Sequence, residues 1–485
     1  MSIPTRLFLC VLCVLCGAEF VSRASQQPSI PKTWDARELA SFELPLVHAD
    51  RSAQHATPDY YYRLAVRPIY KSYPIYVPGS EPAGYMEWLA QREPELAFDA
   101  ATLQSDADWI AAGETVFDAP LGYGATFTLT RVRDRGWYER NQVPVTKDGR
   151  MPFSRYVVRT KGIVEVGSGS CVMCHARVLP DGALLKGAQG NFPADRIVGD
   201  NLRQQAAATK DPAALLAGVR LGQRTFFSMP WVKPDPIARV ESMSIDEIAS
   251  VYEAVPPGAS TRVNLSLFAP AQVPDLIGVQ DRRFLDHTGL VQQRSIADLM
   301  RYVAIVQGAN AFDRFGDFRL VDPVPDPAKM DRYSDEQLYA LGRYLYSLQP
   351  PANPNPESAA PRGRRIFRRE GCNTCHTAPL YTSNTLTPAL GFAVPAEHVK
   401  RYAIIARSVG TDPELAMRTR KGTGYYKVPS LKGAWYRGPF QHAGAVNTLE
   451  EWFDPARLGK VPGHPFGLEL TADDRRALIA FIRTL

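Results

Sequence analysis

The chain has 485 residues, of which 45% are hydrophobic, and its 56 basic and 50 acidic residues give a formal net charge of +6. A chain of this length is expected to form two or three domains of ordinary size, each with its own core. The near balance of charge, together with the lack of a basic run interleaved with aromatic residues, argues against nucleic acid as a partner.

The first 24 residues are organised like a secretory signal peptide. Arg6 precedes an apolar run over residues 7–18, and Ser22-Arg23-Ala24 has the small-x-small form of a cleavage site. The run is shorter than the ~20 residues that span a bilayer, and no later segment approaches that length, so we expect no transmembrane segment. A lipoprotein is the alternative, but no cysteine of this region follows a small residue. We therefore expect an exported, periplasmic protein.

The four cysteines beyond residue 24 lie in two pentapeptides of the form Cys-x-x-Cys-His. These are Cys171-Val172-Met173-Cys174-His175 and Cys372-Asn373-Thr374-Cys375-His376. Two thiols one helical turn apart can bond the two vinyl groups of one porphyrin, and the adjacent imidazole then lies under the iron. The motifs predict two covalently attached haem c groups, on Cys171, Cys174, Cys372 and Cys375, with His175 and His376 as proximal iron ligands.

Three other interpretations of the cysteine pairs are weaker. The pairs of a zinc ribbon usually lie some 15 to 20 residues apart, whereas here about two hundred residues intervene. A disulfide at each pair, or a thioredoxin-like redox site, would not require a histidine directly after the second cysteine. The repeated histidine in an exported chain therefore favours haem.

Residues 358–485 are expected to form a C-terminal cytochrome c domain. A helix is expected to begin near Ser358 and to end at Gly371, just before the second motif. Thr471-x-x-Asp474 forms a capping box at the start of a terminal helix with one apolar face. Residues 349–357 before this domain are rich in proline and are expected to form a stiff linker.

An earlier segment repeats these features. Residues 335–348 align without gaps onto residues 472–485, pairing Ala340 with Ala477 and Tyr344 with Phe481. Capping boxes begin at Ser334 and Ser105, and Gly113-x-x-Val116-Phe117 resembles Gly363-x-x-Ile366-Phe367. We interpret the two halves as a duplicated haem module.

The first module, residues 101–348, is the larger one. Residues 119–168 separate its first helix from the first motif and are expected to form a β-rich insertion, with strands at 126–132, 155–160 and 163–166. Residues 25–100 form an N-terminal extension in which five tyrosines cluster. The expected fold class is mainly α, with two c-type cytochrome domains, the first enlarged by the insertion and the extension.

Four segments of the second module resemble the di-haem cytochrome c peroxidase and MauG superfamily. They are Arg362-Gly363-x-x-Ile366-Phe367, Lys427-Val428-Pro429-Ser430-Leu431, Gly438-Pro439-Phe440-Gln441-His442-Ala443-Gly444 and Thr448-Leu449-Glu450-Glu451. The resemblance is good over residues 358–485, looser over 270–350 and weak before the first motif, apart from residues 113–118. It implies two cytochrome domains facing each other, one haem for electron entry and one for peroxide or oxygen chemistry.

The distal iron ligands are less determined. The family commonly supplies a Met or Tyr to the C-terminal haem, but residues 452–457 contain neither, so His442, Met417 or an open site remain. A His/His pair would lower the potential relative to His/Met. For the first haem the alternatives are His287, an open site, or a methionine among Met229, Met243 and Met300. The sequence context of His48, His55, His398 and His464 does not indicate a ligand role.

Two classes of function are compatible with the motifs. The resemblance favours a peroxidase or related haem oxidase that receives electrons from a small donor protein and passes them to peroxide or oxygen. The alternatives are a di-haem electron carrier without its own substrate and a rubber-oxygenase-like oxygenase. Glu114 and Asp118 are possible acid/base groups. Calcium occurs between the domains of relatives, but no dense ligand pattern establishes it here.

Overall fold

The computed structural model describes residues 28–124, 127–356 and 360–485. The predicted signal peptide and Ser358 lie outside these ranges. Over the described residues, no helix combines the length and the apolar character that a membrane span needs. Helices supply most of the long elements, and most strands are only two or three residues long.

The helices before the linker are distributed from the N-terminal extension to the end of the first module. They are α1 (Ala36–Phe42), α2 (Pro58–Arg63), α3 (Tyr85–Ala90), α4 (Asp106–Asp118), α5 (Leu129–Val132), α6 (Arg135–Asn141), α7 (Cys171–Cys174), α8 (Ala194–Ala208), α9 (Pro212–Phe227), α10 (Ile245–Glu253), α11 (Ile296–Val306) and α12 (Asp335–Ser347). After the linker follow α13 (Pro361–Arg369), α14 (Ala396–Arg401), α15 (Glu414–Met417), α16 (Leu449–Trp452) and α17 (Ala472–Arg483).

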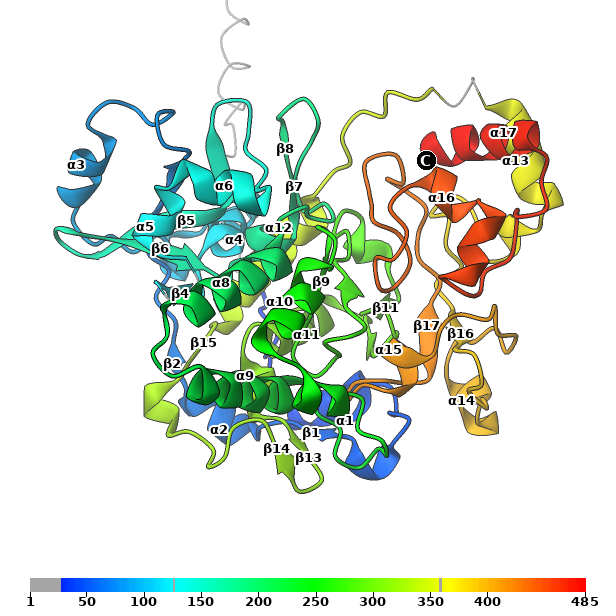
Figure 1. Ribbon diagram of the computed structural model, residues 1–485, viewed down its shortest axis with the longest axis horizontal. Coiled ribbons are helices and arrows are strands. Elements are labelled where there is room, and N and C mark those ends of the chain that lie inside the picture. The colour runs from blue at the N-terminus through cyan, green and yellow to red at the C-terminus, as the bar shows by residue number, and fades with distance from the viewer. Residues whose placement is uncertain (1–27, 125–126, 357–359) are drawn as a thin grey trace, which may run out of the picture.

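One four-stranded antiparallel sheet, in the order β3-β5-β6-β4, lies beside the first motif. Its strands are β3 (Ser72–Tyr76), β4 (Gly122–Tyr123), β5 (Arg150–Thr160) and β6 (Ile163–Ser168). Two predicted strands fall within β5 and β6. The edge strand β3 comes from the N-terminal extension, so the extension is part of the same structure and not a separate unit (Figure 1).

The strand predicted at residues 126–132 is wrong over its described part. Thr128 caps a short helix by accepting a hydrogen bond from the Arg131 amide, and α5 occupies Leu129–Val132. Threonine favours strands, but its hydroxyl also caps helices, and here the local capping bond outweighs the alternation.

The remaining strands form two- and three-stranded ribbons. They are β1 (Ala53–Gln54), β2 (Ala65–Val66), β7 (Ala176–Val178), β8 (Leu184–Lys186), β9 (Ala259–Ser260), β10 (Ala271–Gln272), β11 (Phe284–Leu285), β12 (Val291–Gln292), β13 (Arg314–Phe315), β14 (Phe318–Arg319), β15 (Asp331–Arg332), β16 (Leu386–Pro388) and β17 (Tyr425–Lys427). β1 pairs with β13 and β2 pairs with β15, so the extension is bound to the first module at these points as well.

The predicted helix caps are present. The capping boxes at Ser105 and Ser334 begin α4 and α12, and Thr471 accepts from the Asp474 amide at the start of α17. Each bond satisfies an amide that the first turn of a helix leaves without a partner.

The two modules contain equivalent helix crossings. In the first, Gly113 of α4 lies against Ala340 and Tyr344 of α12, and a Cβ on Gly113 would lie 2.0 Å from the Ala340 carbonyl oxygen. Figure 1 shows the second crossing, α13 with α17, at one end of the molecule (yellow and red).

At the second crossing a Cβ on Gly363 would lie 2.0 Å from the Ala477 carbonyl oxygen and 2.6 Å from Phe481 Cβ. The contacted residues are those that the alignment pairs with Ala340 and Tyr344. Both crossings therefore require glycine, because any side chain would force the helices apart.

A buried charge cluster joins the N-terminal extension to both modules. His55 Nδ1 lies 2.7 Å from Asp313, and Lys421 Nζ lies 3.0 Å from Asp313 and 3.3 Å from Glu43. Burial alone lowers the pKa of His55, but the carboxylates of Glu43 and Asp313 outweigh burial and raise the pKa to about 9. The cluster therefore holds three distant segments together with charges that compensate one another.

We expect Gly363→Ala to lower the free energy of unfolding by about 1–3 kcal/mol, because the added methyl would meet the Ala477 carbonyl. Gly222→Ala in α9 is the matched control: a Cβ there meets no atom within 4 Å, and stability should stay equal or rise by about 0.5–1 kcal/mol. Denaturant unfolding of both variants measures the difference. Equal stability of the two variants would contradict the crossing.

His55→Gln tests the charge cluster through pH. Because the folded pKa lies above the ordinary value of about 6.5, His55 stabilises the fold fully below that pH, and this contribution is lost as the pH rises through about 9. The melting temperature of wild type should thus exceed that of the variant by several degrees at pH 6 and approach it at pH 9.5. His48→Gln, on the same segment, should show no such convergence.

Candidate functional site

The second motif lies at the surface, immediately after α13. Gly371, with φ +72°, turns the chain into a short 3-10 helix, Cys372–Thr374. Cys372 and Cys375 are half-buried free thiols. The two sulfurs therefore remain available for bonding to a ligand in the adjoining cavity.

The imidazole of His376 is fixed by two carbonyl groups. Its Nδ1 lies 3.2 Å from the carbonyl oxygen of Tyr381 and 3.2 Å from that of Pro429. Since a carbonyl only accepts, Nδ1 must carry the proton, and Nε2 then presents a lone pair. Burial lowers the pKa of His376, which keeps the ring neutral, as metal ligation requires.

A cavity of about 520 Å³ adjoins these groups. This volume lies within the roughly 300–1,000 Å³ of small-molecule and cofactor sites. Cys372, Cys375 and His376 line it, with apolar side chains that include Phe367, Val428, Leu431, Ala434, Leu449, Phe453 and Ile482. Four arginines complete the wall: Arg282, Arg407, Arg437 and Arg457. The lining suits a flat apolar ring with anionic substituents.

His464 lies close to His376 in the lining of the same cavity. The two ring centroids are 6.4 Å apart, with 54° between the ring planes. A metal bonded to one nitrogen of each ring at about 2 Å, with each centroid about 1 Å behind its nitrogen, would separate the centroids by roughly 6 Å. The buried Nδ1 of His464 has no hydrogen-bond partner among the described residues. The separation of the two rings is therefore compatible with one iron held by both histidines.

The loop that carries His464 is held by one guanidinium. Arg457 donates to the carbonyl oxygens of Trp452, Val461, Gly463 and His464 at 2.9–3.0 Å. His464 itself has φ +48°, a conformation that costs energy for a residue with a side chain. The surrounding contacts thus fix the position of the ring, which the sequence alone did not indicate.

His442, predicted as a distal ligand, lines the same cavity but has other partners. Its Nε2 lies 3.2 Å from the Tyr426 hydroxyl, its Nδ1 lies 2.7 Å from the Gln441 amide nitrogen, and its ring stacks on Tyr426. Burial lowers its pKa to about 3. The other predicted ligand, Met417, packs in an apolar cluster with Leu415 and does not line the cavity.

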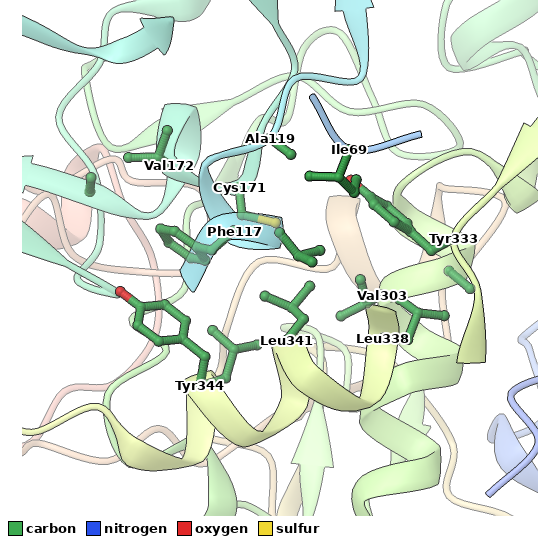
Figure 2. Packing of buried hydrophobic residues seen from close by; sticks show 14 of the residues in the cluster. Ile69, Phe117, Ala119, Cys171, Val172, Val303, Tyr333, Leu338, Leu341 and Tyr344 are labelled. Atoms are coloured by element: carbon green, nitrogen blue, oxygen red, sulfur yellow. The ribbon is translucent and has the colours of Figure 1, made fainter. Parts of the chain in front are cut away.

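The first motif is more deeply placed than the second. Cys171 is buried, and Figure 2 shows its sulfur among apolar side chains of the α4–α12 crossing, including Phe117 and Leu341. Cys174 is half-buried, and both cysteines are free thiols. The first motif therefore begins in the interior of the first module, and its second cysteine is less deeply buried than its first.

The histidine of the first motif repeats the arrangement of the second. His175 Nδ1 lies 3.0 Å from the carbonyl oxygen of Pro274, and burial lowers the pKa of His175 to about 4. Pro274 also lines the cavity next to the second motif. One segment of chain therefore contacts both candidate sites.

His287, the predicted distal ligand of the first site, is bonded elsewhere. Its Nε2 lies 2.5 Å from the carbonyl oxygen of Gln272, and the ring lines the cavity of the second motif. Of the competing methionines, Met300 packs in the main core and Met243 against a smaller apolar cluster. Met229 is buried.

The possible acid/base groups Glu114 and Asp118 are both ion-paired with Lys186, at 2.9 and 2.8 Å. A second ionisable cluster escaped the sequence analysis, and one of its members, Arg262, acts electrostatically on Cys174 of the first motif. Tyr302 donates to Asp286 at 2.8 Å, and Arg262 lies 3.8 Å from the same carboxylate. Among the described residues, no group of three or more His, Cys, Asp or Glu side chains could hold a metal ion by itself.

No protein-family model and no curated protein matches the chain. Among solved structures, the chain is similar to a chain of Kuenenia stuttgartiensis hydrazine synthase pressurised with xenon. The likeness covers 59% of this chain and 92% of that chain, at 16% identity and a TM-score of 0.32. At this TM-score the likeness supports no inference about activity.

Proposed function

We propose that the protein is an exported di-haem c-type oxidoreductase, a peroxidase or related haem oxidase of the di-haem cytochrome c peroxidase and MauG superfamily. Cys171 and Cys174 would hold one haem, and Cys372 and Cys375 the other. The haems would supply one-electron redox chemistry. The equivalent helix crossings and the repeated motifs support two cytochrome-type modules.

One observation carries the proposal: both motif histidines donate Nδ1–H to a proline carbonyl. His175 donates to Pro274 and His376 to Pro429. In each case the ring is held in the tautomer that exposes Nε2, which is the arrangement that protein metal sites use for histidine ligands. A disulfide or a thiol redox pair would not need this orientation, and it occurs at two places about two hundred residues apart.

The two sites are suited to different tasks. At the second, His376 and His464 would both hold the iron, which favours electron transfer over binding of a substrate. Cys171, Cys174 and His175 would hold the other haem, which would supply the chemistry with peroxide or oxygen. Arg262 acts electrostatically on Cys174 and His175 of this motif. It also lies 3.8 Å from Asp286, whose carboxylate accepts from Tyr302 and could hold a proton.

The experiment that tests the proposal uses mature protein from a host competent in cytochrome maturation. We expect the mass of the denatured chain to exceed that of the polypeptide by two haems, and the reduced protein to be reoxidised by peroxide. Cyanide should bind to one haem only, the one attached to Cys171 and Cys174.

The matched variants remove one attachment site at a time. Cys372→Ser/Cys375→Ser should lose one haem and retain cyanide binding, whereas Cys171→Ser/Cys174→Ser should lose one haem together with cyanide binding. A wild-type chain without added mass would refute the haem assignment. If neither haem bound cyanide or reacted with peroxide, the proposed enzymatic activity would be refuted. The protein would then be an electron carrier.

Replacing the two candidate histidines of the second site distinguishes their roles. We expect His464→Ala to convert the second haem from low-spin to high-spin ferric iron and to raise its potential, because an axial imidazole is lost. His442→Ala is the control and should keep the low-spin signal, since both nitrogens of His442 have other partners. Electron paramagnetic resonance measures the spin state of both variants. A high-spin signal in His442→Ala and a low-spin signal in His464→Ala would show that His442 is the iron ligand.

A further inference from the structure

Helix α13, directly before the second motif, is unusually rich in arginine. Five of its nine residues are arginines: Arg362, Arg364, Arg365, Arg368 and Arg369. Its buried residues Gly363, Ile366 and Phe367 pack toward α17. The arginines other than Arg364 are exposed, so the charge lies on the outer face of the helix.

Nearby carboxylates compensate only part of this charge. Asp474 pairs with Arg362 at 2.5 Å and with Arg369 at 2.9 Å, and Glu370 pairs with Arg369 at 3.0 Å. Arg365 and Arg368 have no ion-pair partner among the described residues. The exposed face thus keeps an excess of positive charge, and guanidinium groups bind carboxylates in a bidentate manner.

The excess charge adjoins the more accessible of the two motifs. Gly371, Asn373 and Thr374 are exposed, and Cys372 is half-buried. Cys171, the equivalent of Cys372, is buried. A redox group attached at the second motif would therefore reach solvent beside the arginines, which is where an electron-transfer partner can approach it.

The matching helix of the first module has the opposite character. α4 carries Asp106, Asp108, Glu114 and Asp118, and no arginine or lysine. The positive face is therefore a local property of α13, not a consequence of the formal net charge of +6. A feature that differs between otherwise equivalent helices indicates a role specific to the second module.

We propose that the exposed arginine face of α13 is the docking surface for a small acidic electron-transfer protein. The proposal rests on the proposed function, since it requires haem at Cys372 and Cys375. One electron passes between the partner and the haem, and no atom is transferred. Charge on such a face speeds encounter and orients the partner, and redox complexes of this kind are small and short-lived.

The test measures the rate at which a reduced acidic flavodoxin reduces the second haem, by stopped-flow absorbance. For wild type we expect the rate to fall steeply as salt rises from about 20 to about 300 mM, over which the Debye length shrinks from roughly 20 to 6 Å. Arg365→Glu/Arg368→Glu should lower the rate at low salt by about tenfold or more. With the cationic reductant hexaammineruthenium(II), the same variant should react faster than wild type.

Lys210→Glu/Lys329→Glu is the matched control, because both lysines are exposed in the first module and the change in net charge is the same. It should keep the wild-type rate with flavodoxin. An equal loss in the control, or a wild-type rate that does not depend on salt, would overturn the docking surface even if the arginine variant failed to fold.

Haem content and the ferric spectrum are measured first on each protein. If the protein carried no haem at Cys372 and Cys375, both the proposed function and the proposed docking surface would be refuted. If the protein carried both haems but its rate of reduction by flavodoxin did not depend on salt, only the proposed docking surface would be refuted.

Discussion

The arrangement of both sites depends on hydrogen bonds from imidazole Nδ1 to proline carbonyls. Each bond fixes which nitrogen of His175 or His376 carries the proton, and each is made by a segment far along the chain, at Pro274 or Pro429. The bonds therefore form only when the modules are folded. Burial adds to the effect, because it disfavours the charged ring and leaves a neutral ligand at physiological pH.

Protein contacts position the chain on which His376 and His464 stand. Arg457 donates to three carbonyl groups of the loop around His464, which offsets the cost of the left-handed backbone at that histidine. Carbonyl groups fix the ring of His376. Because the His464 backbone and the His376 ring are held by separate contacts, an iron bound by both would cost little further conformational entropy.

Features that depend on local chemistry could be predicted from the sequence. The capping boxes at Ser105 and Ser334 involve residues three positions apart, and the two motifs have a spacing fixed by their own chemistry. The need for glycine at Gly113 and Gly363 was visible as a repeated pattern, although its cause is a contact with a helix more than a hundred residues away.

Features that depend on distant contacts could not be predicted in this way. His464 stands in a segment of proline and glycine, and its role follows from the cavity and from Arg457, which no local pattern encodes. The sheet edge at β3 pairs segments about eighty residues apart. At residues 129–132 a local signal outweighs the general pattern. The alternation of residue types predicts a strand there, but the Thr128 cap starts a helix.

The differences between the two modules suggest how two copies of one haem module can take on different roles. Both modules keep the glycine crossing and the carbonyl-bound histidine, so both can hold the same kind of ligand. In the second motif Asn373 and Thr374 are exposed, and His464 lies near its histidine. In the first motif Cys171 is buried, and the charge of Arg262 acts on Cys174. Pro274 contacts His175 and also lines the second cavity, so the two sites share a wall. Under the proposed function, the segment around Pro274 would connect the site of electron entry with the other site.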